Sequence, residues 1–439
     1  MTKLSGPAAD LARKIDARTA KVAVIGMGYV GLPLAVEFGN AGFTVVGIDV
    51  DPTRIEAIGR GESYIGDVPS ANLRDLVDSG RLRASLPGDC LGEADAISIC
   101  VPTPLRKSKD PDISYIVAAT EQVAAHVRPG QLIVLESTTY PGTTDEVIRP
   151  RLEECGVTVG EDVFLAFSPE RVDPGNPTFN TRNTPKVVGG ATPACSELAR
   201  LLYAYAVDTV VPVEGTQTAE MVKLLENTFR SVNIGLVNEL AIICDRLGVN
   251  VWDVIAAAAT KPFGFMAFWP GPGLGGHCIP IDPHYLSWKL KTLNYHARFI
   301  ELADEINSSM PEYVVERVVD ALNADKKAVN GSKVFVLGVA YKRDVGDWRE
   351  SPALDIVDHL IRKGADVSWC DPHVGADCPL PPAARRADYD SDELRAADCV
   401  VVVTDHRAFD VDLLLENARL IVDSRNITGG RARDGIWRL

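Results

Sequence analysis

The chain has 439 residues, of which 46% are hydrophobic and 24% charged, so it can fill two or three packed domains and is unlike a disordered sequence. Its net charge of −15, without a block of Lys or Arg, argues against nucleic acid and anionic membranes as partners. No apolar run approaches the ~20 residues that cross a bilayer, which argues against a membrane-spanning protein.

Residues 1–20 lack the apolar core of a secretory signal, and we expect a short leading helix in this segment. The nine cysteines are irregularly spaced and include no C-x-x-C pair. Both observations are typical of free thiols in a reducing compartment, and they predict a cytoplasmic location.

Residues 21–51 have the order strand, glycine-rich turn, helix and strand. The apolar run at 22–25 suits a strand that is buried on both faces, and similar runs follow at 96–101, 132–136 and 163–166. Helical stretches separate these runs. The alternation predicts an α/β fold with a doubly wound, Rossmann-like parallel sheet.

The turn after the first strand carries the pattern Gly26-x-Gly28-x-x-Gly31. Gly26 allows a tight turn, Gly28 lets the backbone approach a pyrophosphate, and Gly31 lets the helix pack closely on the strand. Asp49 ends the next strand, where its carboxylate can accept hydrogen bonds from both ribose hydroxyls and repel a 2′-phosphate. The pattern therefore predicts NAD rather than NADP as the cofactor.

Polar residues follow three further strands of this sheet. Because ligands of an open parallel sheet bind beyond the carboxyl ends of its strands, we expect Thr103 and Thr138 to line the cofactor site. Glu170 and Arg171 follow the strand at 163–166 and belong to the same edge. The alternatives are turn hydroxyls for the threonines and a surface ion pair for the two charged residues.

A long apolar pattern with helical spacing begins near residue 215 and ends near Gly248, and a shorter helix follows. We expect a central helix that forms a dimer face. Lys223 and Asn227 are four residues apart and therefore share one side of this helix. The alternative for Lys223 is a solvated surface residue.

The alternation of strands and helices returns in the last part of the chain. Four runs predict strands, at 331–342, 365–373, 397–406 and 418–426. Residues 351–364 predict an amphipathic helix that ends at Gly364, and residues 379–387 predict an exposed loop. We therefore expect a second, smaller parallel sheet of the same class.

Residues 271–289 place Cys278 in a loop that is rich in glycine and proline. A flexible loop leaves a thiol open to substrate, and backbone N–H groups and a nearby lysine would favour its thiolate form. Asp282 on the same loop can act on water. A thiolate beside a nicotinamide can capture an aldehyde, so that a second hydride can leave the resulting thiohemiacetal.

Two alternatives apply to this loop. His277, Cys278 and His284 could bind a metal, but their spacing fits no common zinc pattern, and we predict no metal site. A buried structural thiol is the other alternative, and the loop-forming composition around Cys278 argues against it.

From about residue 21 to 426 the chain resembles the UDP-glucose/GDP-mannose dehydrogenase family. The similarity is carried by GMGYVGLPLA, ESTTYPGTT, SPER, the helix with Lys223 and Asn227, GPGLGGHCIPIDP and YKRDVGDWRESPA. The resemblance implies a four-electron oxidation of the C6 hydroxyl of a nucleotide sugar to a carboxylate, with NAD as oxidant. It also implies an NAD-binding domain at 1–214, a central helical and dimerisation domain with the cysteine loop at 215–325, and a UDP-sugar-binding domain at 326–439.

The resemblance further implies roles for individual residues. The catalytic residues would be Cys278 as nucleophile, Lys223 and Asn227 as oxyanion-stabilising groups, and Asp282, assisted by Thr138 and Glu170, at the hydrolytic water. The cofactor would be bound by Gly26, Gly28, Tyr29, Val30, Gly31, Asp49, Arg54, Thr103, Thr138 and Arg349. The substrate would be bound by Glu170, Arg171, Lys223, Asn227, Gly275, Arg298 and Lys342, with Arg182 as a further candidate.

The segments SPERVDPGN and IPIDP resemble the branch of the family that acts on UDP-N-acetylhexosamines. UDP-N-acetylglucosamine is the expected substrate, and UDP-N-acetylmannosamine and UDP-glucose are the alternatives. A two-electron alcohol dehydrogenase and a non-catalytic regulator that binds NAD and a nucleotide sugar are the remaining hypotheses. The expected assembly is a homodimer or a higher homo-oligomer.

Overall fold

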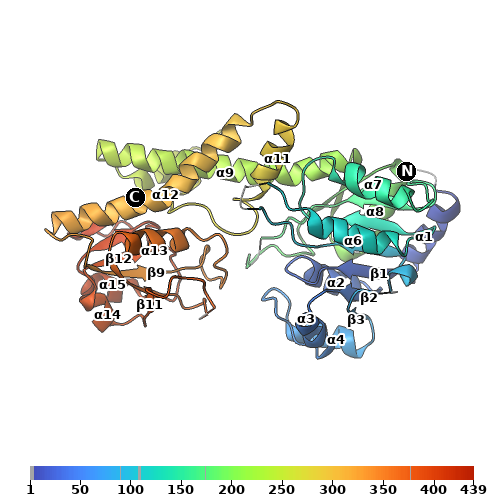
Figure 1. Cartoon of the computed structure of the whole chain (residues 1–439), viewed down its shortest axis with the longest axis horizontal. Coiled ribbons are helices and arrows are strands. Elements are labelled where there is room, and N and C mark those ends of the chain that lie inside the picture. Colours follow the sequence, from blue (N-terminus) through green and yellow to red (C-terminus); the bar gives the residue numbers. More distant parts are fainter. Residues whose placement is uncertain (1–3, 89, 107–109, 174, 376) are drawn as a thin grey trace. The chain divides into compact units, whose positions relative to one another are not determined.

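The computed structural model describes residues 4–88, 90–106, 110–173, 175–375 and 377–439. The chain forms two compact units (Figure 1). The first unit contains residues 1–226 and 284–294, and the second contains residues 227–283 and 295–439. Within the described ranges, none of the helices is at once long and apolar enough to cross a bilayer.

The first unit is built on an eight-stranded sheet with the order β3-β2-β1-β4-β5-β6-β7-β8. Its strands are β1 Lys21–Ile25, β2 Thr44–Ile48, β3 Leu82–Ser85, β4 Ala96–Ile99, β5 Leu132–Leu135, β6 Phe164–Phe167, β7 Lys186–Gly190 and β8 Val210–Val213. Neighbouring strands are parallel except β6 and β7, which are antiparallel. As a result, the first residue of β7 lies at the edge where β4, β5 and β6 end.

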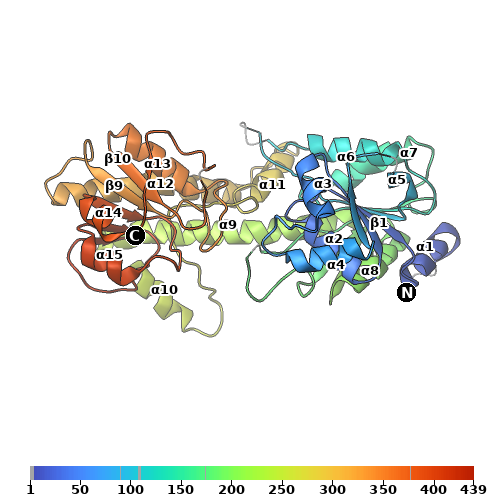
Figure 2. The same ribbon diagram turned by 90° about the horizontal axis from the view of Figure 1, so that it is seen from below.

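Helices cover both faces of this sheet. They are α1 Gly6–Asp16, α2 Gly31–Asn40, α3 Pro52–Gly59, α4 Ser70–Asp78, α5 Cys90–Glu93, α6 Ser114–Ala124, η1 Thr144–Ile148, α7 Arg149–Glu153, α8 Pro193–Ala206 and α11 Asp282–Lys291. Figure 2 shows α2, α4 and α8 on one side of β1, and α5, α6 and α7 on the other. The central strands are buried on both faces, which explains their continuous apolar runs.

The second unit contains a six-stranded sheet with the order β11-β10-β9-β12-β13-β14, and all of its pairs are parallel. Its strands are β9 Lys333–Leu337, β10 Asp366–Cys370, β11 Arg385–Arg386, β12 Cys399–Val402, β13 Ile421–Asp423 and β14 Ile436–Arg438. Its helices are α10 Val251–Ala259, α12 Arg298–Ala324, α13 Pro352–Arg362, α14 Ser391–Ala396 and α15 Val411–Asn417. The helix α9, Gly215–Leu247, begins in the first unit and contributes most of its length to the second.

The strands of the second sheet alternate between two apolar cores. Val334 and Val336 of β9 pack in one core with α12 and α13, and Phe335 and Leu337 pack in the other with α14 and α15. Figure 1 shows these two helix pairs on opposite sides of β9. The period of two along each strand therefore sorts the side chains between the layers.

The structure confirms the predicted fold class of two parallel-sheet α/β units and a long central helix. The leading helix is α1, while residues 1–3 of the predicted segment lie outside the described residues. The predicted helix at 351–364 is α13, which is capped by the Ser351 side chain. One prediction is wrong in part: the loop expected at 379–387 ends in β11, because Arg385 and Arg386 pair with β10.

Candidate active site

The glycine pattern lies in the turn between β1 and α2, in the first unit. Gly26 has a positive φ of +90°, and a Cβ there would lie 2.5 Å from the carbonyl oxygen of Cys100. A Cβ on Gly31 would lie 1.8 Å from the carbonyl oxygen of Gly26. At Gly28, however, a Cβ would meet nothing closer than an Arg54 nitrogen at 4.0 Å. The space beside the Gly28 backbone is therefore open, as a bound pyrophosphate requires.

Asp49 lies directly beside this turn. Its buried carboxylate accepts hydrogen bonds from the Met27 N–H at 2.8 Å and from the Asp51 N–H at 3.0 Å. Arg54 contacts the same carboxylate at 3.1 Å and the Asp51 carboxylate at 3.7 Å. A 2′-phosphate would face two acidic side chains here, so the site fits NAD better than NADP.

One bracing residue of this turn was missed by the sequence analysis. The Tyr64 hydroxyl donates a hydrogen bond to the Met27 carbonyl at 2.6 Å. Burial is the main reason that the pKa of Tyr64 is raised far above its usual value, so the hydroxyl stays protonated and keeps donating. No local motif marks a tyrosine 37 residues away as a partner of the turn.

Thr103 and Thr138 follow the neighbouring strands β4 and β5 and lie at the same sheet edge. Thr103 is buried and Thr138 is half-buried. The Ser137 hydroxyl joins the two segments, since it donates to the carbonyl oxygens of Val101 at 2.8 Å and Ile99 at 3.2 Å. Tyr29 is exposed and Val30 precedes α2 at the entrance to the turn.

Glu170 is held by its own loop and by a lysine that the sequence analysis did not single out. The N–H groups of Arg171 and Val172 each donate to Oε1 at 2.8 Å, and Lys186 Nζ donates to Oε2 at 3.2 Å. Burial opposes the charge on Glu170, but Lys186, the Val172 N–H and Lys223 outweigh it and lower the pKa of that carboxyl. Glu170 is therefore ionised at neutral pH.

The other arginines of this region have partners within the first unit. The Arg171 guanidinium pairs with Glu226 and donates to the Pro185 carbonyl oxygen at 2.7 Å. The Arg182 guanidinium lies 3.3 Å from Asp208 and 3.8 Å from Glu37. Arg171 is therefore in an ion pair, but with Glu226 and not with Glu170, and the predicted substrate roles of Arg171 and Arg182 stay predictions.

The cysteine loop belongs to the second unit, and its glycines have a different role from the one expected. A Cβ on Gly275 or Gly276 would lie 2.6–2.7 Å from the Tyr341 side chain, and the Gly276 N–H donates to the Arg349 carbonyl at 3.1 Å. The expectation of a flexible loop is therefore corrected, because these glycines permit close packing. Cys278 itself is half-buried.

Cys278, Asp282 and Asn227 are connected by short hydrogen bonds. The Cys278 carbonyl accepts from the Asp282 N–H at 2.8 Å, which starts the first turn of α11. The Asn227 amide nitrogen donates to the Asp282 carboxylate at 2.6 Å. Lys223, one turn away from Asn227 on α9, is only 8% exposed, so the alternative of a solvated surface lysine is wrong.

Arg425 is a second residue that the sequence analysis missed. It follows β13 at the carboxyl edge of the second sheet, where its Nε donates to the Val403 carbonyl oxygen at 3.0 Å. A Cβ on Gly271 would lie 2.6 Å from its guanidinium. Burial, and then the charge of Arg343, lower the pKa of Arg425 to about 10. A half-buried cation that faces the glycine loop fits an anionic group of a ligand.

The remaining predicted residues of the second unit lie on two segments. Lys342 is half-buried in the loop after β9, and Arg349 on the same loop pairs with Asp347 at 2.6 Å. Arg298 is the exposed first residue of α12. Their predicted roles toward substrate and cofactor stay predictions.

One group of potential metal ligands occurs among the described residues, formed by Asp344, His373 and His406. The His406 Nδ1 accepts from the Asp344 N–H, and its Nε2 bonds to Asp371, both at 2.9 Å. Arg407 lies 3.4 Å from the Asp344 carboxylate. With both ring nitrogens engaged and a cation beside the acid, the group fits an internal brace better than a metal site.

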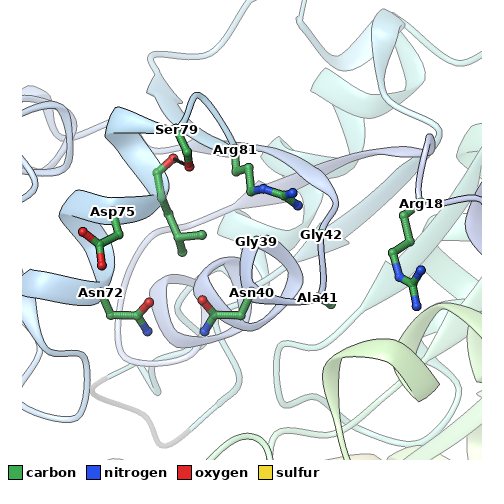
Figure 3. Close-up of a pocket in the computed structure, with 10 residues that line it drawn as sticks. Arg18, Gly39, Asn40, Ala41, Gly42, Asn72, Asp75, Ser79 and Arg81 are labelled. Atoms are coloured by element: carbon green, nitrogen blue, oxygen red, sulfur yellow. Dashed lines mark hydrogen bonds between the residues drawn. The ribbon is translucent and has the colours of Figure 1, made fainter.

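The first unit also has an open hollow of about 600 Å³ between α2 and α4. Figure 3 shows Asn40 and Asn72 facing each other across it, with Arg81 and Arg18 near Gly42. It lies before β2 and β3, at the opposite ends of the strands from the glycine turn. Two helix C-termini border it, and their partial negative charge is complementary to the two arginines. The hollow is not the cofactor site.

The comparisons with known proteins agree with this arrangement. The chain matches the UDP-glucose/GDP-mannose dehydrogenase family in its NAD binding domain at residues 20–207, its central domain at 217–309 and its UDP binding domain at 335–430. The chain belongs to this family. The first unit contains the NAD-binding domain of the family, and the chain is an NAD-dependent nucleotide-sugar dehydrogenase.

Several relatives are similar over most of their length. A UDP-N-acetyl-D-mannosamine dehydrogenase of Methanococcus maripaludis is 38% identical, with 93% of each chain covered. A UDP-N-acetyl-D-glucosamine 6-dehydrogenase of Pseudomonas aeruginosa is also 38% identical, with 81% of this chain and 84% of the relative covered. The solved UDP-D-ManNAc dehydrogenase of Pyrococcus horikoshii has a TM-score of 0.87 at 33% identity, covering 95% of this chain and 98% of its own.

The glycine turn gives a prediction that separates cofactor binding from folding. Gly28→Ala should leave the melting temperature unchanged but weaken NAD binding at least tenfold, because the methyl group enters only the space for the pyrophosphate. Gly31→Ala should cost about 1–3 kcal/mol of stability, because its methyl group meets a backbone oxygen. Calorimetric NAD titration and thermal unfolding measure the two effects.

Gly59→Ala, at the end of α3, is the matched control, since a Cβ there meets nothing within 4 Å. It should change neither quantity, with stability within about 0.5 kcal/mol of the parent. Unchanged NAD affinity in Gly28→Ala would contradict the assignment of the open space to the cofactor.

Proposed function

We propose that this protein oxidises the C6 hydroxyl of a UDP-N-acetylhexosamine to the carboxylate, in a four-electron reaction with Cys278 as the covalent nucleophile. Family membership supports the nucleotide-sugar substrate and the use of NAD. The acetamido sugar is supported by the relatives, which include dehydrogenases of UDP-N-acetylmannosamine and UDP-N-acetylglucosamine.

The observation that carries the proposal is the connection of Cys278 to Asp282 and Asn227. A two-electron dehydrogenase has no need of a thiol, of an acid on the same turn, or of an amide fixed to that acid. Here the Asp282 N–H is bonded to the Cys278 carbonyl at 2.8 Å, and the Asp282 carboxylate to Asn227 at 2.6 Å. The first bond holds the backbones of Cys278 and Asp282 within one helical turn, and the second orients a carboxylate that can act on water.

In the proposed reaction NAD supplies the hydride acceptor, and the residues of this chain do the remaining work. The Cys278 sulfur forms a bond to the aldehyde carbon, and the carbonyl oxygen takes up the negative charge. Lys223 and Asn227, one turn apart on α9, are the groups that stabilise this oxyanion. The thioester formed after the second oxidation step is cleaved by water, which releases the acid and the Cys278 thiolate.

Two acids serve the hydrolytic step in this proposal. Asp282 is 2% exposed and oriented by Asn227, so its carboxylate can hold and deprotonate a water molecule. Glu170 assists together with the half-buried Thr138, and it is ionised at neutral pH because of Lys186. The ordering of the acids before substrate arrives is what lowers the barrier.

The diphosphate of the substrate needs cationic partners, for which the second unit offers Arg425 and Lys342. Arg425 is half-buried beside Gly271, at the carboxyl edge of the parallel sheet where ligands of this fold bind. Tyr341 packs on Gly275 and so ties the glycine loop to the segment that carries Lys342. We propose that these residues, with Arg298 as a further candidate, form the UDP-sugar site within the predicted domain at 326–439 and the adjoining loop.

The number of electrons transferred tests the covalent mechanism. The wild-type protein should release two NADH for each sugar converted to acid, because alcohol and aldehyde each lose one hydride. Cys278→Ser should lower acid formation by at least a thousandfold while NAD affinity stays unchanged. NADH absorbance and chromatographic analysis of the sugar acid are the measurements. One NADH per sugar with free aldehyde as the product would support the two-electron alternative instead.

The epimer of the substrate is a separate prediction. The sequence favours UDP-N-acetylglucosamine, while two of the cited relatives, covered over more of their length, carry the name of the manno epimer. Steady-state kinetics with the gluco, manno and galacto UDP-N-acetylhexosamines and UDP-glucose should rank an acetamido sugar first. The kcat/KM for UDP-glucose should be lower by tenfold or more, because contacts to the acetamido group are lost. A higher kcat/KM for UDP-glucose would contradict the proposed substrate class.

We also propose that the protein is a homodimer or higher homo-oligomer located in the cytoplasm. All nine cysteines are free thiols, which supports a reducing compartment. On α9 the side chains of Leu236, Ile243 and Leu247 are exposed and repeat at seven and four residues, so they form one apolar stripe. A stripe of this spacing is typical of a helix that packs against a second copy.

Replacing residues of this stripe by charged ones should separate the subunits of the proposed oligomer. Leu236→Glu combined with Ile243→Glu should convert the protein to a monomer in light-scattering measurements, because two carboxylates would be desolvated in the contact. Val117→Glu, which replaces another exposed apolar residue on α6, is the control and should leave the assembly unchanged. A monomeric wild-type protein would contradict the proposal.

A further inference from the structure

Three charged side chains form a buried cluster at the carboxyl edge of the first sheet. Lys186, the first residue of β7, donates to Glu136 Oε2 at 2.7 Å and to Glu170 Oε2 at 3.2 Å. The exposed fractions of the three side chains are 5%, 0% and 12%. We refer to Lys186, Glu136 and Glu170 as the Lys186 cluster.

The antiparallel direction of β7 is what brings the cluster together. Glu136 directly follows β5, and Glu170 lies three residues after β6. Because β7 runs against β6, its first residue comes to the edge at which those strands end. A buried lysine among apolar strands is strongly destabilising unless it is paired, and here two carboxylates share one ammonium group.

The pKa values of the two carboxyl groups are shifted in opposite directions. Burial raises the pKa of Glu136, and Tyr203 donates a hydrogen bond to its other oxygen. Glu170 instead has its pKa lowered, since Lys186, the Val172 N–H group and Lys223 together outweigh burial. The pKa of Lys186 is raised, because both acids outweigh its burial. The cation is therefore permanent, and Glu170 is the acid that it keeps charged.

The groups that face Glu170 come from several elements. Lys186 approaches it from β7 and Lys223 acts on it from α9, while the Arg171 and Val172 N–H groups belong to its own loop. Glu136 directly follows β5 and the buried thiol of Cys100 directly follows β4, and both act on Lys186. Lys186 is therefore the cation that both acids of the cluster share.

We propose that Lys186 is a positioning residue of the oxidation, which holds Glu170 as an oriented carboxylate for the hydrolytic step. The inference rests on the proposed function, in which Glu170 assists the water that cleaves the thioester. Lys186 does not touch substrate in this proposal. It donates a hydrogen bond to one oxygen of Glu170. Lys186 is itself held by Glu136, which accepts a hydrogen bond from Tyr203. The alternative is a purely structural role, in which the cluster links β5 to β7 and its loss affects stability alone.

The test is the pH profile of acid formation in Lys186→Met and Lys186→Arg. Without the cation, the remaining acid Glu136 and the burial favour protonated Glu170, so the acidic limb of kcat should move up by at least one pH unit in Lys186→Met. Below the new midpoint the rate should fall about tenfold per pH unit, and at high pH it should return toward the wild-type rate. Lys186→Arg keeps the charge and should retain the wild-type limb.

A second readout identifies the step. If hydrolysis is what slows in Lys186→Met at low pH, the covalent adduct on Cys278 should accumulate and appear in the intact mass of the protein. Two NADH per subunit should still be released in the first turnover. A structural role alone would produce neither the adduct nor the pH shift.

The controls separate folding from positioning. Lys14→Met removes a lysine from a pair with Asp95 in the same unit, so it should lower stability without moving the limb. If Lys186→Met does not fold, Lys186→Met combined with Glu136→Gln removes one charge of each sign and restores the balance. The acidic limb in the pH dependence of its kcat should still lie at a higher pH than that of the wild type. NAD titration reports whether each variant is folded.

The outcomes distinguish this inference from the function on which it rests. A wild type that releases one NADH per sugar overturns the four-electron proposal itself. A wild type with two NADH, together with an unchanged acidic limb in Lys186→Met or in the double variant, overturns only the role of Lys186. A loss of activity that is the same at every pH would also overturn it, because a structural tie explains such a loss.

Discussion

In each sheet, the turn after the strand that comes first in the sequence must pass close to a carbonyl oxygen in the segment that follows the neighbouring strand. Gly26 and Gly338 meet this constraint in the same way, since both have positive φ and a Cβ on either would lie 2.5 Å from an oxygen of Cys100 or Thr404. A carboxylate closes each turn: Asp49 accepts from Met27, and Asp371 accepts from two N–H groups of the turn after β9. The ligand-binding edges of both sheets depend on these two turns.

The two turns differ in how much of the acid's hydrogen-bonding capacity they leave for a ligand. Asp371 accepts from four backbone N–H groups and bonds to His406, and these interactions outweigh burial and lower its pKa to about 2. The Asp371 carboxylate is therefore fully engaged in hydrogen bonds within the protein. Asp49 has fewer donors, and open space lies beside Gly28. This difference explains why one sheet binds the dinucleotide and the other supports a loop that carries Tyr341, Lys342 and Arg349.

The buried polar groups at the proposed reaction residues have one property in common. Lys186 with its two glutamates, and Asn227 with Asp282, are desolvated groups whose partners are fixed before any ligand arrives. Replacing such pairs by apolar residues is often neutral or stabilising, so stability alone does not account for them. A requirement for oriented charge does, because a preorganised site avoids the cost of ordering dipoles during the reaction.

The sequence by itself determined the fold class, the glycine turn with its acid, and the long helix, because these depend on local periodicity and on residues less than one supersecondary unit apart. It also marked Cys278 and Asp282 as neighbours. It did not reveal Lys186, Tyr64 or Arg425, since each acts on a partner far along the chain. Only the tertiary structure showed that Gly275 and Gly276 serve close packing against Tyr341, because steric contact between distant segments leaves no local pattern. The antiparallel entry of β7, which brings a lysine to the edge of a parallel sheet, was likewise decided by strand pairing and not by composition.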